Sequence, residues 1–205
     1  MSDMNDSYKT IEKPSQGIYK EKGSKFLSYA FPVFSEEEIK KHIHSLREEY
    51  YNARHHCFAW QLGLDGTRYR ANDDGEPSGT AGKPILGQLN SHELTNILVV
   101  VVRYFGGTKL GVPGLIRAYK EATIDAINNA VVLQCTVNDT YKVHFEYAAM
   151  NDIMKIMKEE NMNILDQQFD LACCVEFSLR QSETKKVIER LENLESAKCE
   201  YVCSR

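Results

Sequence analysis

Three acidic residues beside a run of glycines are the first candidates for chemistry in this sequence. They are Asp73, Asp74 and Glu76, and the hydroxyl of Ser78 follows two residues later. Carboxylates spaced in this way can serve as general acids or bases, or can hold a divalent cation. Asx turns and helix caps use the same residue types. The sequence therefore leaves open whether this acid cluster binds a ligand or only shapes a turn.

The basic segment from residue 103 to 120 is a second candidate, suited to anions. It has four basic residues and no acidic one. All of the 12 glycines except Gly17 and Gly23 lie between Gly63 and Gly114, and this density indicates positive φ angles or close backbone approach. A strand leading through a glycine-rich turn into a helix would present backbone N–H groups in a concave array. Basic and aromatic side chains beside such an array suit phosphates and unstacked bases.

The residues expected to bind phosphate or nucleic acid come from several parts of the chain. They are Lys25, Lys83, Arg103, Tyr104, Gly106, Gly107, Thr108, Lys109 and Arg117. A second interpretation of the same region is structural. In it, Tyr104 and Phe105 plug the end of a strand, and Arg103 pairs with one of the acids at 73, 74 or 76. Local sequence does not decide between the two interpretations.

Standard nucleotide and hydrolase motifs do not account for the glycines. A P-loop needs a glycine where Pro77 stands, and a Ser or Thr where Pro84 follows Lys83. Thr108 takes the place of the second glycine of a dinucleotide-binding fingerprint. Ser78 lacks the flanking glycines of a nucleophile elbow. Nucleotide binding by a standard loop is thus excluded, and no cofactor is expected.

The cysteines give little indication of a metal site. The chain has 6 cysteines but no Cys-x-x-Cys pair, so zinc ligands would have to gather from distant positions. Cys199 and Cys203 share one face of an expected strand, which is weak support, and small buried side chains are the commoner explanation. Cys57 follows His56, but neighbours on a strand point to opposite faces. We expect Cys57 in the core and no bound metal.

Alternating and helical periodicities predict the elements that position these candidates. A capping box of Ser35 and Glu38 begins a helix whose apolar positions extend to Tyr50. The run 97–102 is apolar at both parities, which predicts a strand buried on both faces. It leads to a helix with Pro113 in its first turn, ending near residue 128. Further strands are expected at 17–21, 24–33, 56–62 and 68–71, with turns at 22–23 and 65–66 and a short helix at 85–89.

The rest of the chain predicts a separate domain. Its expected helices lie at 150–157 and after Ser182, a helix-capping residue. Its expected strands lie at 137–147, 164–169, 172–179 and 197–203. The order β-α-β-β-α-β is the ferredoxin-like pattern, a scaffold without chemistry of its own. We therefore predict an α+β chain of two domains, 1–134 and 135–205, with the chemistry in the first.

Composition and charge bound the class of protein. Of 205 residues, 42% are hydrophobic and 26% charged, as in ordinary globular chains. No apolar run approaches the roughly 20 residues that span a bilayer, and the polar N-terminus lacks the order of a signal peptide. We expect a cytoplasmic protein without membrane contact. The net charge of −4 does not exclude polyanions, because screened charges act over only about 8–10 Å.

The glycine-rich region resembles the signature of a known family. Residues 71–86 (Ala-Asn-Asp-Asp-Gly-Glu-Pro-Ser-Gly-Thr-Ala-Gly-Lys-Pro-Ile-Leu) and 96–111, which include Arg-Tyr-Phe-Gly-Gly-Thr-Lys-Leu-Gly, are similar to the IMPACT/YigZ family. The resemblance covers roughly residues 17–132, and the whole chain looks like the bacterial two-domain type. It implies that the first domain has the fold of ribosomal protein S5 domain 2, followed by the ferredoxin-like domain.

The resemblance also implies a partner. The same tandem of domains occurs at the end of the translocating elongation factor, which implies ribosomal or structured RNA. Eukaryotic IMPACT proteins dampen the amino-acid-starvation kinase by competing for its ribosome-associated activator. By this resemblance we expect the chain to depart from them, without their extra N-terminal domain and with a different C-terminal one.

Two main functional hypotheses follow. The first is a non-enzymatic protein that binds RNA, the ribosome or a ribosome-associated protein and regulates translation or a stress response. The alternative is an enzyme or sensor for a small phosphorylated ligand or nucleotide at the glycine turns. In that case the acid cluster would hold Mg²⁺ or supply a base. A protein–protein adaptor, in which the glycines only shape a surface, is a third possibility.

Overall fold

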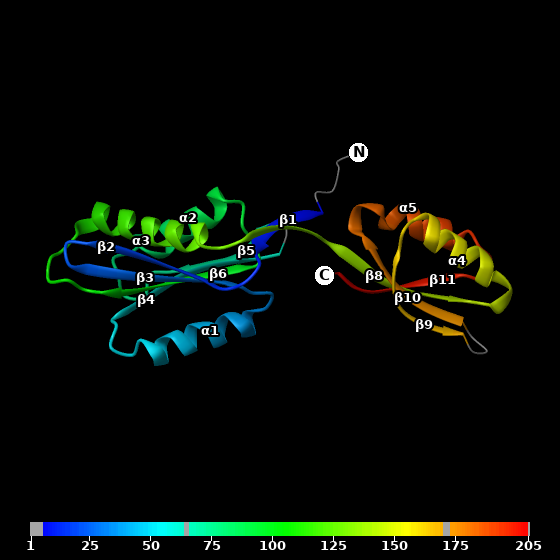
Figure 1. The fold of residues 1–205 in the computed structure, drawn as a ribbon, viewed down its shortest axis with the longest axis horizontal. Coiled ribbons are helices and arrows are strands. Elements are labelled where there is room, and N and C mark those ends of the chain that lie inside the picture. Colours follow the sequence, from blue (N-terminus) through cyan, green and yellow to red (C-terminus); the bar gives the residue numbers. More distant parts are fainter. Residues whose placement is uncertain (1–5, 64–65, 170–172, 205) are drawn as a thin grey trace. The chain divides into compact units, whose positions relative to one another are not determined.

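The computed structural model describes residues 6–63, 66–169 and 173–204, which form two compact units. The first unit extends from Tyr8 to Cys135, and the second contains residues 136–204 together with Asp6 and Ser7. The domains predicted from the sequence, 1–134 and 135–205, differ from these units at Cys135 and at Asp6 and Ser7. Each unit combines helices with a sheet of its own (Figure 1).

The first unit is built on a five-stranded sheet. Its strand order is β2-β3-β6-β4-β5, with every neighbouring pair antiparallel. Helix α1 covers one face of this sheet, and α2 and α3 cover the other (Figure 1). A separate two-stranded pair joins β1 to β7. The elements are β1 (Ser7–Ile11), β2 (Ser15–Glu21), β3 (Ser24–Pro32), α1 (Glu36–Glu49), β4 (His55–Leu62), β5 (Arg68–Asn72), α2 (Gly82–Ser91), β6 (Ile97–Tyr104), α3 (Gly111–Asn128) and β7 (Val132–Thr136).

Strand β6 is the centre of the first unit, and both of its faces are buried. Val99 and Val101 pack in the core beneath α2 and α3. Leu98, Val100 and Val102 pack in the core beneath α1. The prediction from the apolar run 97–102 is confirmed. A strand held this firmly gives the residues that follow it a fixed starting point.

The ends of the helices agree with the sequence at α1 and differ at α2. The hydroxyl of Ser35 accepts a hydrogen bond from the backbone N–H of Glu38 at 3.2 Å, so the predicted N-cap is confirmed. The Glu38 carboxylate reaches back one residue further than in a capping box and accepts from the Phe34 N–H at 2.8 Å. Helix α2 covers ten residues, twice the short segment 85–89 that was expected. The turn expected at 65–66 lies partly outside the described residues, because Asp65 is not described.

The second unit has a four-stranded antiparallel sheet in the order β11-β8-β10-β9. Its sequence of elements, β-α-β-β-α-β, is the one predicted. Cys173, Val175, Phe177 and Leu179 share the buried face of β10, as expected, whereas residue 172 lies outside the described residues. The elements are β8 (Asn138–Phe145), η1 (Tyr147–Ala149), α4 (Met150–Glu159), β9 (Asn163–Phe169), β10 (Cys173–Arg180), α5 (Gln181–Glu192) and β11 (Lys198–Ser204).

The start of α5 corrects one sequence expectation. Ser182 was expected to cap this helix, but the N-cap residue is Arg180 and its side chain makes no capping bond. Instead, the carboxylate of Asp6 accepts hydrogen bonds from the Arg180 guanidinium at 2.7 and 2.8 Å and from the Ser182 N–H at 3.0 Å. The hydrogen bonds from Arg180 hold the pKa of Asp6 well below its usual range. A residue far away in sequence thus supplies the cap.

Two further expectations concern membranes and cysteines. Within the described residues, no helix has the length and apolar character needed to cross a bilayer. All six cysteines lie in the described chain as free thiols, and Cys57 is buried. Cys57 belongs to the core beneath α2 and α3, as predicted, whereas His56 pairs with Val102 of the opposite face.

Candidate functional site

The glycine-rich segments lie at one end of the five-stranded sheet. Lys25, near the start of β3, is the register partner of Tyr104 at the end of β6. His55, at the start of β4, is the partner of Arg103. The β2–β3 turn, the β6–α3 loop and the β5–α2 loop therefore meet at this end of the first unit (Figure 1). We call the three segments together the glycine-rich end.

The β2–β3 turn is in direct contact with the β6–α3 loop. The backbone N–H of Gly106 donates a hydrogen bond to the hydroxyl of Ser24 at 3.1 Å. A Cβ atom on Gly106 would lie 1.8 Å from the carbonyl carbon of Gly23, so no other side chain fits without moving one of the two segments. Close backbone approach is a requirement that glycine alone can meet. The contact therefore keeps the turn and the loop in a fixed relation.

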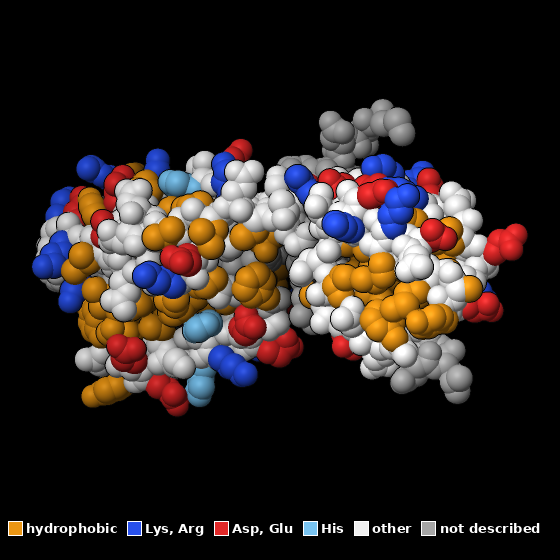
Figure 2. All heavy atoms as spheres, turned by 45° about the vertical axis from the view of Figure 1, so that its right-hand side comes forward, with side chains coloured by type: hydrophobic (Ala, Val, Ile, Leu, Met, Phe, Trp, Pro, Cys, Tyr) orange, Lys and Arg blue, Asp and Glu red, His pale blue; other side chains and the backbone are white. Residues whose placement is uncertain are grey.

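This contact places lysines from distant parts of the sequence on one surface. Figure 2 shows Lys and Arg side chains gathered at this end of the first unit. We call the following set of cations the basic end: Lys20, Lys22, Lys25, Lys109 and Arg117. All five are exposed, and in the described part of the chain none of them forms an ion pair.

The turn itself is hollowed. Residues 20–25 line an open depression of about 420 Å³, with three lysines around it. Arg117, in the second turn of α3, lies close to Tyr19. Burial raises the pKa of the Tyr19 phenol, and the charge of Arg117 opposes this rise. Glu21 lies close to the same phenol, whose hydroxyl donates to the Glu21 carboxylate at 3.2 Å. The lysine charges thus outnumber the acid beside them.

The N-terminus of α3 adds partial positive charge to the same end. Gly107 and Gly111 have φ angles of +87° and +71°, a region that favours glycine. Within the described chain, no side chain caps α3 and no acidic residue lies in its first turn. Thr108, between the two glycines, is exposed. Unoccupied backbone N–H groups at a helix N-terminus favour anions.

The two aromatic residues after Arg103 have different environments. The hydroxyl of Tyr104 donates a hydrogen bond to the side-chain oxygen of Asn52 at 2.8 Å. Phe105 is 57% exposed, and the Arg103 guanidinium lies 5.7 Å from its ring centre. The sequence singled out Tyr104 for ligand contact, but Phe105 is the ring that faces solvent. The only sequence signal that Phe105 would face solvent was its place directly after Tyr104, because neighbouring residues of an extended chain point to opposite sides.

Arg103 lies in the interior, where it pairs with Glu76. The guanidinium contacts the Glu76 carboxylate at 2.6 Å, and Tyr119 donates to the same oxygen at 2.8 Å. Only 7% of the Arg103 side chain is exposed. Of the two interpretations that the sequence left open for Arg103, the structure therefore shows pairing with an acid. The pair fastens the β5–α2 loop to the end of β6.

Asp73 organises the β5–α2 loop. Its carboxylate accepts hydrogen bonds from the backbone N–H groups of Gly79, Ala81 and Gly82, at 2.8, 2.9 and 2.9 Å. Burial by itself would raise the pKa of Asp73, but the three N–H donors and the charge of Lys83 outweigh burial and lower it. Asp73 is thus the cap of α2, a helix whose N-cap residue makes no side-chain bond.

Asp74 holds the same loop against β4 and α1. Its φ angle is +40°, and its carboxylate accepts from the His56 backbone N–H at 2.7 Å and from Arg47 at 2.8 Å. Its carbonyl oxygen contacts the His55 ring at 2.8 Å. Ser78, the fourth member of the predicted cluster, is exposed. All three carboxylates therefore have partners within the protein.

His56 and Cys57, at the same end of the sheet, are buried in the protein interior. Burial lowers the pKa of His56 and raises the pKa of the Cys57 thiol. The thiol donates a hydrogen bond to the carbonyl oxygen of Asp73 at 3.0 Å. Across the described ranges, no group of three or more His, Cys, Asp and Glu side chains has the arrangement of a metal site.

The structure thus separates the predicted site residues into two groups. Lys25, Thr108, Lys109 and Arg117 are exposed, and Gly106 and Gly107 shape the β6–α3 loop, which carries Thr108 and Lys109. The acid cluster lies in the β5–α2 loop, and Arg103 of β6 pairs with its Glu76. Lys83, in the first turn of α2, is exposed, and its charge helps to lower the pKa of Asp73. Sequence reasoning missed Lys20 and Lys22, which it assigned only to a strand and a turn.

Comparisons with known proteins agree on one family. Residues 22–127 match the family model described as Impact N-terminal domain. The chain is 30% identical over 192 residues to the IMPACT family member YvyE of Bacillus subtilis, covering 94% of this chain and 88% of that protein. It is 35% identical over 150 residues to YigZ of Escherichia coli, covering 72% and 74%. A crystal structure described as that of a hypothetical protein is similar at a TM-score of 0.72 and 28% identity, over 98% of this chain and 99% of that one. The chain belongs to the IMPACT family.

Proposed function

We propose that this chain is a non-enzymatic protein that binds RNA or the ribosome and regulates translation or a stress response. The observation that supports this most is the basic end. Five unpaired cations from β2, the β2–β3 turn, β3, the β6–α3 loop and α3 share a surface with an uncapped helix N-terminus. Such surfaces bind phosphates without reading sequence.

The exposed Phe105 ring supports RNA in preference to a simple anion. Single-stranded RNA is bound where unstacked bases can lie on aromatic side chains beside cations. Phe105 follows β6 directly and precedes the glycines that carry Lys109, so a base and a phosphate of one strand could be bound by neighbouring residues. Tyr104 is the less suitable partner because its hydroxyl is bonded to Asn52.

We further propose that the two units have the folds implied by the family resemblance. The first would be ribosomal protein S5 domain 2-like and the second ferredoxin-like. The strand order β11-β8-β10-β9 with two helices on one face supports the second assignment. This tandem occurs in the translocating elongation factor, so the ribosome, or a protein bound to it, is the partner we favour. A cytoplasmic location follows from that partner.

The alternative, a nucleotide or Mg²⁺ at the acid cluster, has little support from the described residues. Asp73 accepts three backbone hydrogen bonds, Asp74 binds Arg47 and the His56 N–H, and Glu76 binds Arg103. A bound cation would have to displace these donors, and this would remove the hydrogen bonds that hold the β5–α2 loop in place. We therefore do not assign the acid cluster a catalytic role.

Co-sedimentation with ribosomes over a series of salt concentrations tests the proposal. The protein is expected to pellet with ribosomes at low salt and to be released as salt rises. Each phosphate contact should contribute about −0.7 to −0.9 to the slope of log affinity against log salt. Absence of the protein from the ribosome pellet at low salt would count against the proposal.

A further inference from the structure

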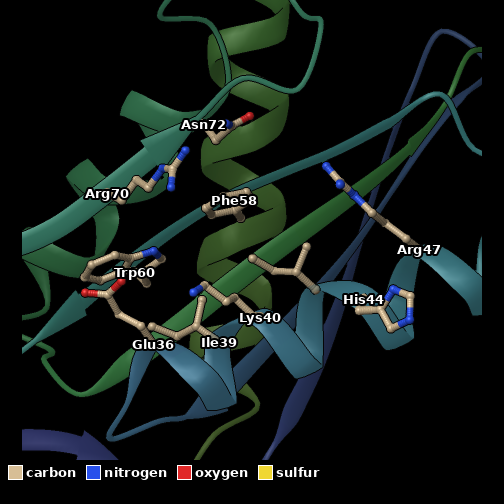
Figure 3. Close-up of a pocket in the computed structure, with 10 residues that line it drawn as sticks. Glu36, Ile39, Lys40, His44, Arg47, Phe58, Trp60, Arg70 and Asn72 are labelled. Atoms are coloured by element: carbon tan, nitrogen blue, oxygen red, sulfur yellow. The ribbon is translucent and has the colours of Figure 1, made fainter.

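A groove between α1 and the sheet is a feature of the first unit that the basic end does not use. It lies on the α1 face of β4 and β5 and has a volume of about 380 Å³ (Figure 3). Small-molecule sites begin at about 300 Å³. The groove is open to solvent beside β5, which is one of the two edge strands of the sheet. It therefore has the size and access that a small ligand needs.

The floor of the groove is apolar and aromatic. Phe58 and Trp60 of β4 point toward α1, and Ile39 of α1 faces them (Figure 3). Ile43 of α1 also lines the groove. Phe58 and Trp60 are buried members of the core beneath α1, so their rings are held in place. Two fixed rings beside a gap offer a surface on which a planar group can pack in an offset or edge-to-face arrangement.

The rim of the groove is basic. Lys40 of α1 and Arg70 of β5 reach over the same space from opposite sides, with Phe58 and Trp60 between them (Figure 3). Both cations are exposed, and neither forms an ion pair within the described residues. They are the groups of the rim that remain available to an anion.

The other charged residues of the rim are already paired. Arg47 contacts Asp74 at 2.8 Å. Glu36 contacts Arg68 at 3.3 Å. Because the single acid of the rim is neutralised by Arg68, the electrostatic potential of the groove is set by Lys40 and Arg70. The charge that complements this groove is negative.

We propose that this groove binds a small organic anion that combines an aromatic ring with a carboxylate or phosphate. The ring packs on Trp60 and Phe58, and the anionic group lies between Lys40 and Arg70. A ring without charge leaves the cations unsatisfied, and an anion without a ring makes no contact with the aromatic floor. The site is separate from the basic end and does not depend on the proposed function.

Trp60 provides a direct readout, because it is the single tryptophan of the chain. The full-length protein is titrated with AMP and UMP as aromatic phosphates and with 4-hydroxyphenylacetate as an aromatic carboxylate, while Trp60 fluorescence is recorded. Saturable quenching by either class supports the proposal and identifies the source of the anion. Adenosine and inorganic phosphate, which each carry half of the required chemistry, should bind at least about tenfold more weakly, the effect of one charged hydrogen bond.

Charge reversal at the rim separates this site from general surface binding. Lys40→Glu and Arg70→Glu should each weaken the aromatic anion about tenfold or more. Lys41→Glu, the same change on the next residue of α1, which does not line the groove, should leave affinity unchanged. Far-ultraviolet circular dichroism checks that each variant is folded. Absence of saturable quenching with all three probes, or equal affinity in the rim variants and Lys41→Glu, would overturn the proposal.

Discussion

The backbone N–H of Gly106 donates a hydrogen bond to the hydroxyl of Ser24, and this contact joins segments that are 82 residues apart. It brings the lysines of the β2–β3 turn to the β6–α3 loop. Lys25 lies in β3, which already pairs with β6, and the contact extends this pairing into the loop that carries Lys109. The basic end is therefore a product of backbone packing, and it depends on a glycine at position 106.

The first prediction concerns Gly106. Gly106→Ala should destabilise the first unit by about 1–3 kcal/mol, the usual cost of overpacking, because its Cβ would lie 1.8 Å from the Gly23 carbonyl carbon. Urea unfolding followed by Trp60 fluorescence measures this unit. Gly87→Ala is the matched control, because a Cβ there meets nothing within 4 Å. In the middle of a helix it should stabilise by about 0.5–1 kcal/mol. Equal effects at both positions would contradict the account.

The second prediction concerns the buried pair of Arg103 and Glu76. Arg103→Met should destabilise the first unit by about 3–5 kcal/mol, because it leaves the Glu76 carboxylate buried without its cation. Adding Glu76→Gln should recover part of the loss, because the uncompensated charge is removed. The two single variants and the double variant form a cycle read by Trp60 fluorescence. Strictly additive effects would show that the residues do not interact.

The third prediction concerns pH and Asp73. Because the folded-state pKa of Asp73 is lowered, its stabilisation is fully present above the unfolded value of about 3.9. It is lost as pH falls below that value toward the folded pKa. Asp73→Asn should therefore lower the stability of the first unit at neutral pH and reduce its loss of stability in acid. Urea midpoints from neutral to acidic pH check this. Parallel curves for the variant and the wild type would contradict the assigned role.

Sequence patterns predicted the elements well, because their signals are local. The apolar run 97–102 has no polar position, so burial of β6 on both faces was the single consistent interpretation. The N-cap contact of Ser35 and Glu38 lies within four residues. The β-α-β-β-α-β order of the second unit followed from alternation and helical spacing in the same way.

The site was harder to predict, because its decisive contacts are long-range. Arg103 could have met any of three nearby acids, and the conformation of the β5–α2 loop, which the sequence does not show, brought it to Glu76. Asp6 caps α5 across 176 residues, a contact that no local pattern indicates. Lys20 and Lys22 were passed over because a turn sequence does not show what the turn will meet.

The most direct test of the basic end compares two triple variants of equal charge in ribosome co-sedimentation. Lys22→Glu/Lys25→Glu/Lys109→Glu reverses three cations of this surface, and Lys13→Glu/Lys41→Glu/Lys185→Glu reverses three exposed lysines elsewhere. The account predicts that the first variant binds at least about tenfold more weakly, with a salt slope shallower by about 2, and that the second sediments like the wild type. Equal losses in the two variants, or none in either, would contradict it.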